Sequence, residues 1–183
     1  MKKKGKIIVL VVVIVILLLG VVGYVKFKDS FKFSKEYNVS KFNNFSYKSL
    51  SDVFDMLNDK ESGIVFFCYS DNSWCKEYVK VLNDASLDNG AKVYYVDIKN
   101  DMDNKSDSYN KLVTLLENRL YKDITGNEVL YVPYLMFFKD GVITSYDNET
   151  SLVVGNVTAD SYWTVDGIKN FNTRFKSFYK EIK

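Results

Sequence analysis

The sequence contains no histidine, and this absence removes a large part of enzyme chemistry from consideration. Catalytic sites of the Ser-His-Asp and Cys-His kinds need an imidazole, and most zinc sites use one as a ligand. We therefore expect no metal site, and no feature of the sequence indicates a cofactor. Only two cysteines are present, Cys68 and Cys75, which is too few for a disulfide-scaffolded domain.

Proline is nearly absent as well, and the single one, Pro133, stands before an apolar, aromatic run from Tyr134 to Phe138. Lys139-Asp140-Gly141 closes this run and a second β-prone segment follows, so the stretch predicts a buried strand that turns into a hairpin. Because proline cannot donate a hydrogen bond within a sheet, Pro133 is expected at the first residue of the strand. A lone proline at this point indicates a fixed turn, and we expect the function of the protein beside it.

One stretch lacks charge altogether, the 19 residues 7–25, and it follows a basic tip. At about 1.5 Å per residue it spans roughly 28 Å, close to the hydrocarbon thickness of a bilayer. Because no small-residue cleavage site follows, the run predicts an uncleaved, single-pass anchor in the cell membrane. Lysine placement favours a cytoplasmic N-terminus and an extracytoplasmic domain. We divide the chain into tip and anchor (1–28), a spacer or edge segment (29–48) and a folded domain (49–183).

Acidic residues are missing from the first 28 positions, whereas 6 of the 25 basic residues lie there. From residue 29 onward, 19 basic side chains stand against 23 acidic ones, a net charge of −4. Such a domain offers no electrostatic surface for nucleic acid. The basic residues between 26 and 35 are expected to form a solvated spacer, with contact to anionic headgroups as the alternative.

Beyond the anchor, apolar runs and helical periodicity alternate along the chain. Strands are predicted at Ile64–Cys68 and Ala91–Ile98, with a helix between them that opens near Ser73. A crossover helix makes these two strands parallel, while the hairpin after Pro133 is antiparallel. The fold class is therefore α/β, with a mixed central sheet flanked by helices. Asp147-Asn148-Glu149 is expected to form a polar tip.

The chemistry of the chain is expected at Cys75, in the first turn of the predicted helix. Orphan N–H groups and the positive end of the helix dipole favour a thiolate at such a position. Together with the β-α-β unit and the proline hairpin, this arrangement resembles the thioredoxin superfamily over about residues 49–182. Two segments carry the resemblance, residues 64–76 and 132–141. It implies a cis Val132–Pro133 bond against the active-site loop, where the backbone of Val132 would meet an extended substrate peptide.

The sequence departs from the Cys-x-x-Cys motif of that superfamily. If Cys75-Lys76 matches the second cysteine and its lysine, Asn72 stands in place of the attacking thiol and Phe66 in place of a common buried acid. If Trp74-Cys75 matches the usual Trp-Cys, Cys75 is the nucleophile and Tyr78 replaces the resolving cysteine. Lys76 and the apolar spacing that follows favour the first alignment.

Three interpretations of the cysteines stay open. Cys68 and Cys75 could approach within bonding range, as a redox pair or as a disulfide that pins the loop. Cys75 could instead act alone through mixed disulfides. Finally, Cys68 could be a small buried hydrophobe and Cys75 a vestige, so that the domain only binds. Asn72 either caps the helix or bonds a peptide backbone, and Trp74 either packs or contacts a ligand.

Two classes of function follow. In the first, a membrane-anchored bacterial protein exchanges disulfides with thiol-bearing exported proteins through Cys75, alone or with Cys68. In the second, the domain has no catalysis and holds a peptide or protein partner in a groove beside Pro133. The bacterial origin is inferred from the Lys- and Asn-rich, proline-poor composition alone.

Overall fold

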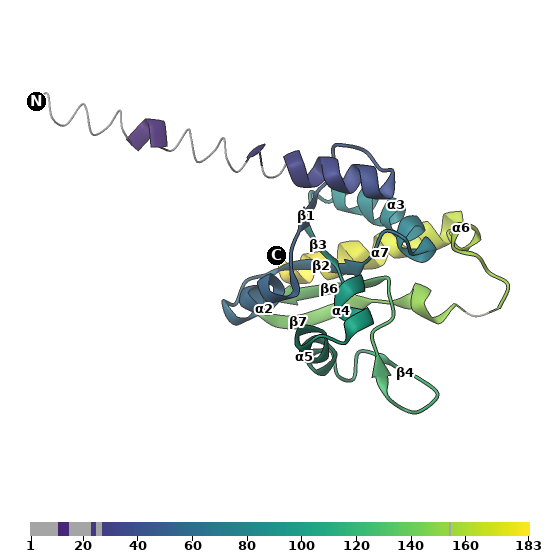
Figure 1. Cartoon of the computed structure of the whole chain (residues 1–183). Helices are drawn as coiled ribbons and strands as arrows, with labels where there is room; N and C mark the ends of the chain where they lie inside the picture. The colour runs from purple at the N-terminus through teal and green to yellow at the C-terminus, as the bar shows by residue number, and fades with distance from the viewer. Residues whose placement is uncertain (1–10, 15–22, 25–26, 154) are drawn as a thin grey trace, which may run out of the picture.

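The computed structural model describes residues 11–14, 23–24, 27–153 and 155–183 (Figure 1). Among these residues, no helix combines the length and the apolar character needed to cross a bilayer. Most of the predicted anchor at 7–25 lies outside the described ranges, so the anchor stays a prediction.

A five-stranded mixed sheet forms the centre of the domain, in the order β1-β3-β2-β6-β7. β3 runs parallel to both β1 and β2, whereas β6 runs antiparallel to β2 and β7. This confirms the predicted parallel β-α-β unit followed by an antiparallel hairpin. The strands are β1 (Phe45–Tyr47), β2 (Gly63–Cys68), β3 (Val93–Asp97), β6 (Tyr134–Lys139) and β7 (Val142–Asp147).

Helices cover both faces of the sheet, and each face has its own apolar cluster. The helix at residues 27–37, α3 (Ser73–Asp88) and α7 (Val165–Ile182) pack on one face, with α6 (Ala159–Tyr162) beside α3 (Figure 1). On the other face lie α2 (Leu50–Asn58), α4 (Lys99–Asn104) and α5 (Asp107–Leu115). The predicted α/β class, with a mixed central sheet flanked by helices, is confirmed.

β2 is central because its sequence is apolar on both faces, as a strand covered on both sides requires. Every residue from Ile64 to Cys68 is buried. β6 pairs with it and is buried from Tyr134 to Phe138. The β6–β7 hairpin turns at Asp140 and Gly141, both with positive φ (50° and 78°), as expected for an Asp-Gly two-residue turn.

The segment 29–48 is more than a spacer. Its first part belongs to the helix at 27–37, whose Phe33 and Tyr37 are only 0% and 2% exposed. Phe33 stacks on Phe45 of β1 at a ring-centroid distance of 3.9 Å. The helix and the edge strand that follows it are therefore part of the same core as the remainder of the domain.

Three short elements were not expected from the sequence. The polar stretch before residue 107 forms α4, and the irregular stretch before Pro133 contains a small hairpin. A 3-10 helix follows Asn148. The small hairpin pairs β4 (Tyr121–Lys122) with β5 (Glu128–Val129), and the 3-10 helix is η1 (Glu149–Leu152).

Candidate functional site

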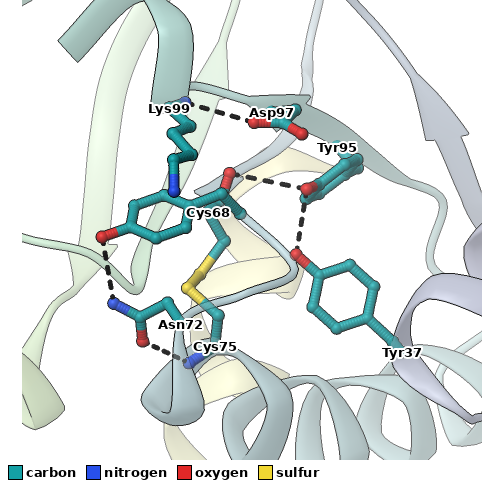
Figure 2. Close-up of a disulfide and its surroundings, with 8 residues drawn as sticks. Tyr37, Cys68, Asn72, Cys75, Tyr95, Asp97 and Lys99 are labelled. Carbon is teal, nitrogen blue, oxygen red and sulfur yellow. Dashed lines mark hydrogen bonds between the residues drawn. A yellow bond between two sulfur atoms is a disulfide. The ribbon is translucent and has the colours of Figure 1, made fainter. Parts of the chain in front are cut away.

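Cys68 and Cys75 form a disulfide between the end of β2 and the first turn of α3 (Figure 2). Their Cα atoms are 5.9 Å apart, and both side chains are 0% exposed. Of the three interpretations left open by the sequence, the structure contains the bonded pair. A cysteine pair that closes a disulfide at this point of the fold supports a thiol–disulfide redox role.

The loop between the two cysteines is held by its own polar contacts. Asn72 is the N-cap of α3, and its side-chain oxygen accepts the backbone N–H of Cys75 at 3.0 Å (Figure 2). Asn72 also donates to the hydroxyl of Tyr69 at 3.4 Å. Asp71 pairs with Lys99 of α4, and the hydrogen bond from this lysine lowers the pKa of the Asp71 carboxyl. The loop geometry thus has supports besides the S–S bond.

Two buried tyrosines connect the N-terminal helix with Cys68. Tyr37 donates to the hydroxyl of Tyr95 at 2.9 Å, and Tyr95 donates to the carbonyl oxygen of Cys68 at 3.5 Å (Figure 2). The same carbonyl accepts the backbone N–H of Ile98 at 3.1 Å. Burial raises the pKa of both tyrosines, so the hydroxyls stay protonated and remain donors.

The Val132–Pro133 bond is cis, as the resemblance implied. β2 and β6 pair in a register that sets Phe67 opposite Tyr134, and one further step places Cys68 opposite Pro133. Val132 is half-buried and packs against the cluster that contains both cysteines. The structure therefore brings the disulfide and the cis bond side by side, at the ends of adjacent strands.

A short segment after β7 also lies over the start of α3. Trp74 is half-buried, and its ring meets Tyr162 of α6 edge-on at 5.6 Å. A surface hollow of about 360 Å³ lies between the two helices. The residues around this hollow are Ser73, Lys76, Glu77, Thr158, Ala159 and Asp160. An incoming chain could approach the first turn of α3 from this side.

The buried acid near the site comes from β7, which the sequence analysis missed. Phe66 is fully buried on β2 and stacks on Tyr78 at 5.4 Å, so this strand position carries no carboxylate. The Tyr78 hydroxyl donates to Asp147 at 3.0 Å, and Arg174 donates to the other oxygen at 2.7 Å. Asp147 is only 5% exposed.

The expectation of a polar tip at Asp147-Asn148-Glu149 is therefore corrected, because the first two residues are buried. Three polar residues in a row after a strand predict exposure. The signal that could have corrected this is Arg174, a cation on the largely apolar, inward side of the last helix. No sequence motif links Asp147 with Arg174.

The predicted site residues thus fall in one neighbourhood, although their roles stay predictions. Cys68 and Cys75 are bonded, Asn72 caps the helix between them, and Val132 with Pro133 lies beside them. The ring of Trp74 packs against Tyr162 of α6.

No protein-family model matches the chain, and no curated protein matches it. The chain is similar to the crystal structure of thioredoxin O2 from Arabidopsis thaliana in the oxidized state, with 17% identity and a TM-score of 0.43. That similarity covers 75% of this chain and 96% of the other. Thioredoxin O1 from the same plant, also oxidized, gives 18% identity and a TM-score of 0.40 over 72% and 97% of the two chains. The α/β fold described above rests on the strand order of the sheet and not on these similarities.

Proposed function

We propose that this chain, whose folded domain is thioredoxin-like, performs thiol–disulfide exchange on exported proteins through Cys75 together with Cys68. The observation that carries the proposal is the disulfide between these residues, one strand pairing away from the cis bond at Pro133. Residues 7–25 would anchor the protein in the membrane, with the N-terminus in the cytoplasm and the domain outside.

The exchange proceeds in two balanced steps. In the reduced protein, the Cys75 thiolate attacks a substrate disulfide, which forms a mixed disulfide and releases one substrate thiolate. The Cys68 thiolate then attacks Cys75, closing the internal disulfide and releasing the second substrate thiolate. The substrate gains two electrons and the protein loses two. The same steps in reverse move the disulfide onto a substrate dithiol.

The position of Cys75 suits the role of attacking thiol. It is the third residue of α3, where the positive end of the helix dipole stabilises a thiolate. Its own N–H is already taken by Asn72, so the stabilisation comes from the helix end as a whole rather than from that donor. Cys68, at the end of a buried strand, lacks such a setting and suits the resolving role.

Access requires movement, because neither cysteine is exposed in the oxidized state. The segment that must move is the connection Tyr69–Asn72, which links β2 to α3 between the two cysteines. The Asp71–Lys99 pair is exposed to solvent, and exposed ion pairs stabilise a fold very little. Opening of this loop is therefore cheap in comparison with opening the core.

A second function is favoured by the same burial. If the disulfide only pins the loop, the domain is a binding module that holds a peptide or protein partner beside Pro133. The two functions differ in whether the bond is reduced and re-formed under native conditions. A purely structural disulfide stays oxidized in a glutathione buffer, whereas the fraction of an exchange-active disulfide that is reduced follows the glutathione ratio.

The test uses the full chain in detergent micelles or vesicles. Thiols are counted after equilibration in glutathione buffers of graded ratio, and reduction of a model protein disulfide by the reduced chain is then measured. The exchange proposal expects two thiols per reduced chain, and turnover that is lost in Cys75→Ala. With Cys68→Ala, a mixed disulfide with the substrate should accumulate on Cys75. Turnover that survives in Cys75→Ala overturns the proposal, and a bond that resists every buffer favours the binding module.

Membrane anchoring is tested separately. Alkaline carbonate extraction should leave the chain in the membrane pellet. Protease added outside intact cells should remove the domain, since the domain is proposed to be extracytoplasmic. Complete protection of the domain would reverse the proposed orientation.

A further inference from the structure

The helix at residues 27–37 carries its charged and aromatic side chains on separate sides. Phe33 and Tyr37 point into the core and are buried. At about 100° per residue, Asp29 and Glu36 lie on a second side, and both contact Tyr47 of β1. Asp29 accepts the backbone N–H of Tyr47 at 3.2 Å, and Glu36 accepts its hydroxyl.

The third side of this helix carries no carboxylate. Its residues fall within about 100° of arc, and the loop that follows the helix adds two more of the same kinds. We call this set the basic-aromatic face, and it consists of Phe27, Lys28, Phe31, Lys35, Lys41 and Phe42. Lys32, at its border, is already paired with Glu36 at 3.7 Å.

The phenyl rings and ammonium groups of this face are interleaved. Lys35 lies 4.4 Å from the centre of the Phe31 ring and Lys41 lies 5.4 Å from it. Phe27 stacks on Phe31 at 6.2 Å. Two of the rings are nevertheless open to solvent, since Phe27 is 66% and Phe42 is 86% exposed.

Solvent exposure of these phenyl rings is unfavourable, and the lysines around them indicate a negatively charged surface as the partner that covers them. In water, an uncovered phenyl ring loses the free energy of burial, whereas at a membrane surface it enters the headgroup region while lysines meet anionic phosphates. The place of the face in the chain points to the same occupant. Phe27 follows the uncharged run 7–25 after a single intervening residue, so a membrane that holds the run is within reach of the face.

We infer that the basic-aromatic face lies on anionic lipid headgroups and fixes the domain in one orientation against the membrane. The inference rests on the proposed anchoring but goes beyond it, because an anchor alone would leave the domain free to tilt. It also replaces the expectation of a solvated spacer at residues 26–35. Each lysine near an anionic surface contributes ~1 kcal/mol, so loss of three changes the ratio of docked to undocked domain by roughly 100-fold.

The experiment uses the full chain with Phe42→Trp, reconstituted into vesicles. The vesicles contain a fixed fraction of phosphatidylcholine brominated near the top of its acyl chains, with or without phosphatidylglycerol, and this bromine quenches a tryptophan that enters the membrane interface. The chain without this substitution supplies the background from its two natural tryptophans. The inference expects stronger quenching in the anionic vesicles, and salt should reverse the increase because it screens exposed charges.

A charge-removal pair decides between this face and a general charge effect. Lys28→Gln, Lys35→Gln and Lys41→Gln together should abolish the phosphatidylglycerol-dependent quenching. The matched control removes three exposed lysines near α4, α5 and β4, by Lys105→Gln, Lys111→Gln and Lys122→Gln, and should leave the quenching unchanged. Near-ultraviolet circular dichroism verifies that both variants remain folded.

The outcomes separate the inference from the proposals on which it builds. Equal quenching in neutral and anionic vesicles, or equal loss in both triple variants, overturns the inference. Quenching that depends on protein concentration rather than on lipid charge would assign the face to a second copy and also overturn it. Carbonate extraction reports on the anchor alone, and thiol counting reports on the exchange site alone, so each proposal can fail by itself.

Discussion

The bond between Cys68 and Cys75 joins residues seven positions apart and so closes a ring of eight residues. A ring of this size removes about 8 cal/mol/K of chain entropy from the unfolded state, or about 2.5 kcal/mol at 25 °C. The folded loop changes little on reduction, because the Asn72 cap also holds it in place. We therefore expect reduction to lower the free energy of unfolding by about 2.5 kcal/mol.

The measurement is urea unfolding of the full chain in detergent micelles, with and without a dithiol reductant. Trp74 stands next to Cys75 and reports the transition by its emission. With a slope of ~1–3 kcal/mol/M, the midpoint should fall by roughly 0.8–2.5 M urea on reduction. The double variant Cys68→Ala/Cys75→Ala is the control, and its urea midpoint should not change when the reductant is added. A difference below about 0.5 kcal/mol between oxidized and reduced protein would refute the reasoning.

Three further predictions concern stability. Asp147→Ala leaves the buried hydroxyl of Tyr78 and the guanidinium of Arg174 without their shared carboxylate, and should cost about 3 kcal/mol in urea unfolding; Asp147→Asn should recover part of this, and a neutral result for both would contradict the role of the network. Gly141→Ala should cost about 2 kcal/mol by the same assay, because φ is +78° and a Cβ would meet a backbone carbonyl of α2. Hydrogen bonds from the N-cap of α2 lower the pKa of Asp52, so the stabilisation by Asp52 is present above its unfolded pKa of ~3.9 and is lost as the pH falls through the folded value. The difference in unfolding free energy between the unchanged chain and Asp52→Asn should therefore vanish in acid. A difference that stays constant with pH would exclude the cap as its source.

Local patterns were sufficient for the centre of this fold. The apolar run of β2 and the Asp-Gly turn after β6 are set by neighbouring residues, and both formed where the sequence predicted them. The sequence also offers Asn72 as a helix cap, since its side-chain oxygen lies only three residues from the N–H that it binds. The cis bond was implied by the resemblance rather than by the lone proline itself.

Contacts between distant segments could not be predicted in this way. The helix at 27–37 looked like a spacer because the partners of Phe33 and Tyr37 are Phe45 and Tyr95, which only the folded sheet brings near. Asp147 looked exposed because its cation is 27 positions away on another element. The pairing of the two cysteines stayed open because it depends on the path of the loop between them.

The cap that holds the connection Tyr69–Asn72 has a kinetic consequence. After reduction, the Asn72 cap still keeps the two freed sulfurs close neighbours, so either one meets the other far more often than it meets an outside thiol. If the chain exchanges disulfides as proposed, a mixed disulfide with a partner protein will be short-lived, because the second cysteine attacks it and releases the partner. A lasting adduct should be isolated only from a chain in which one member of the pair has been removed.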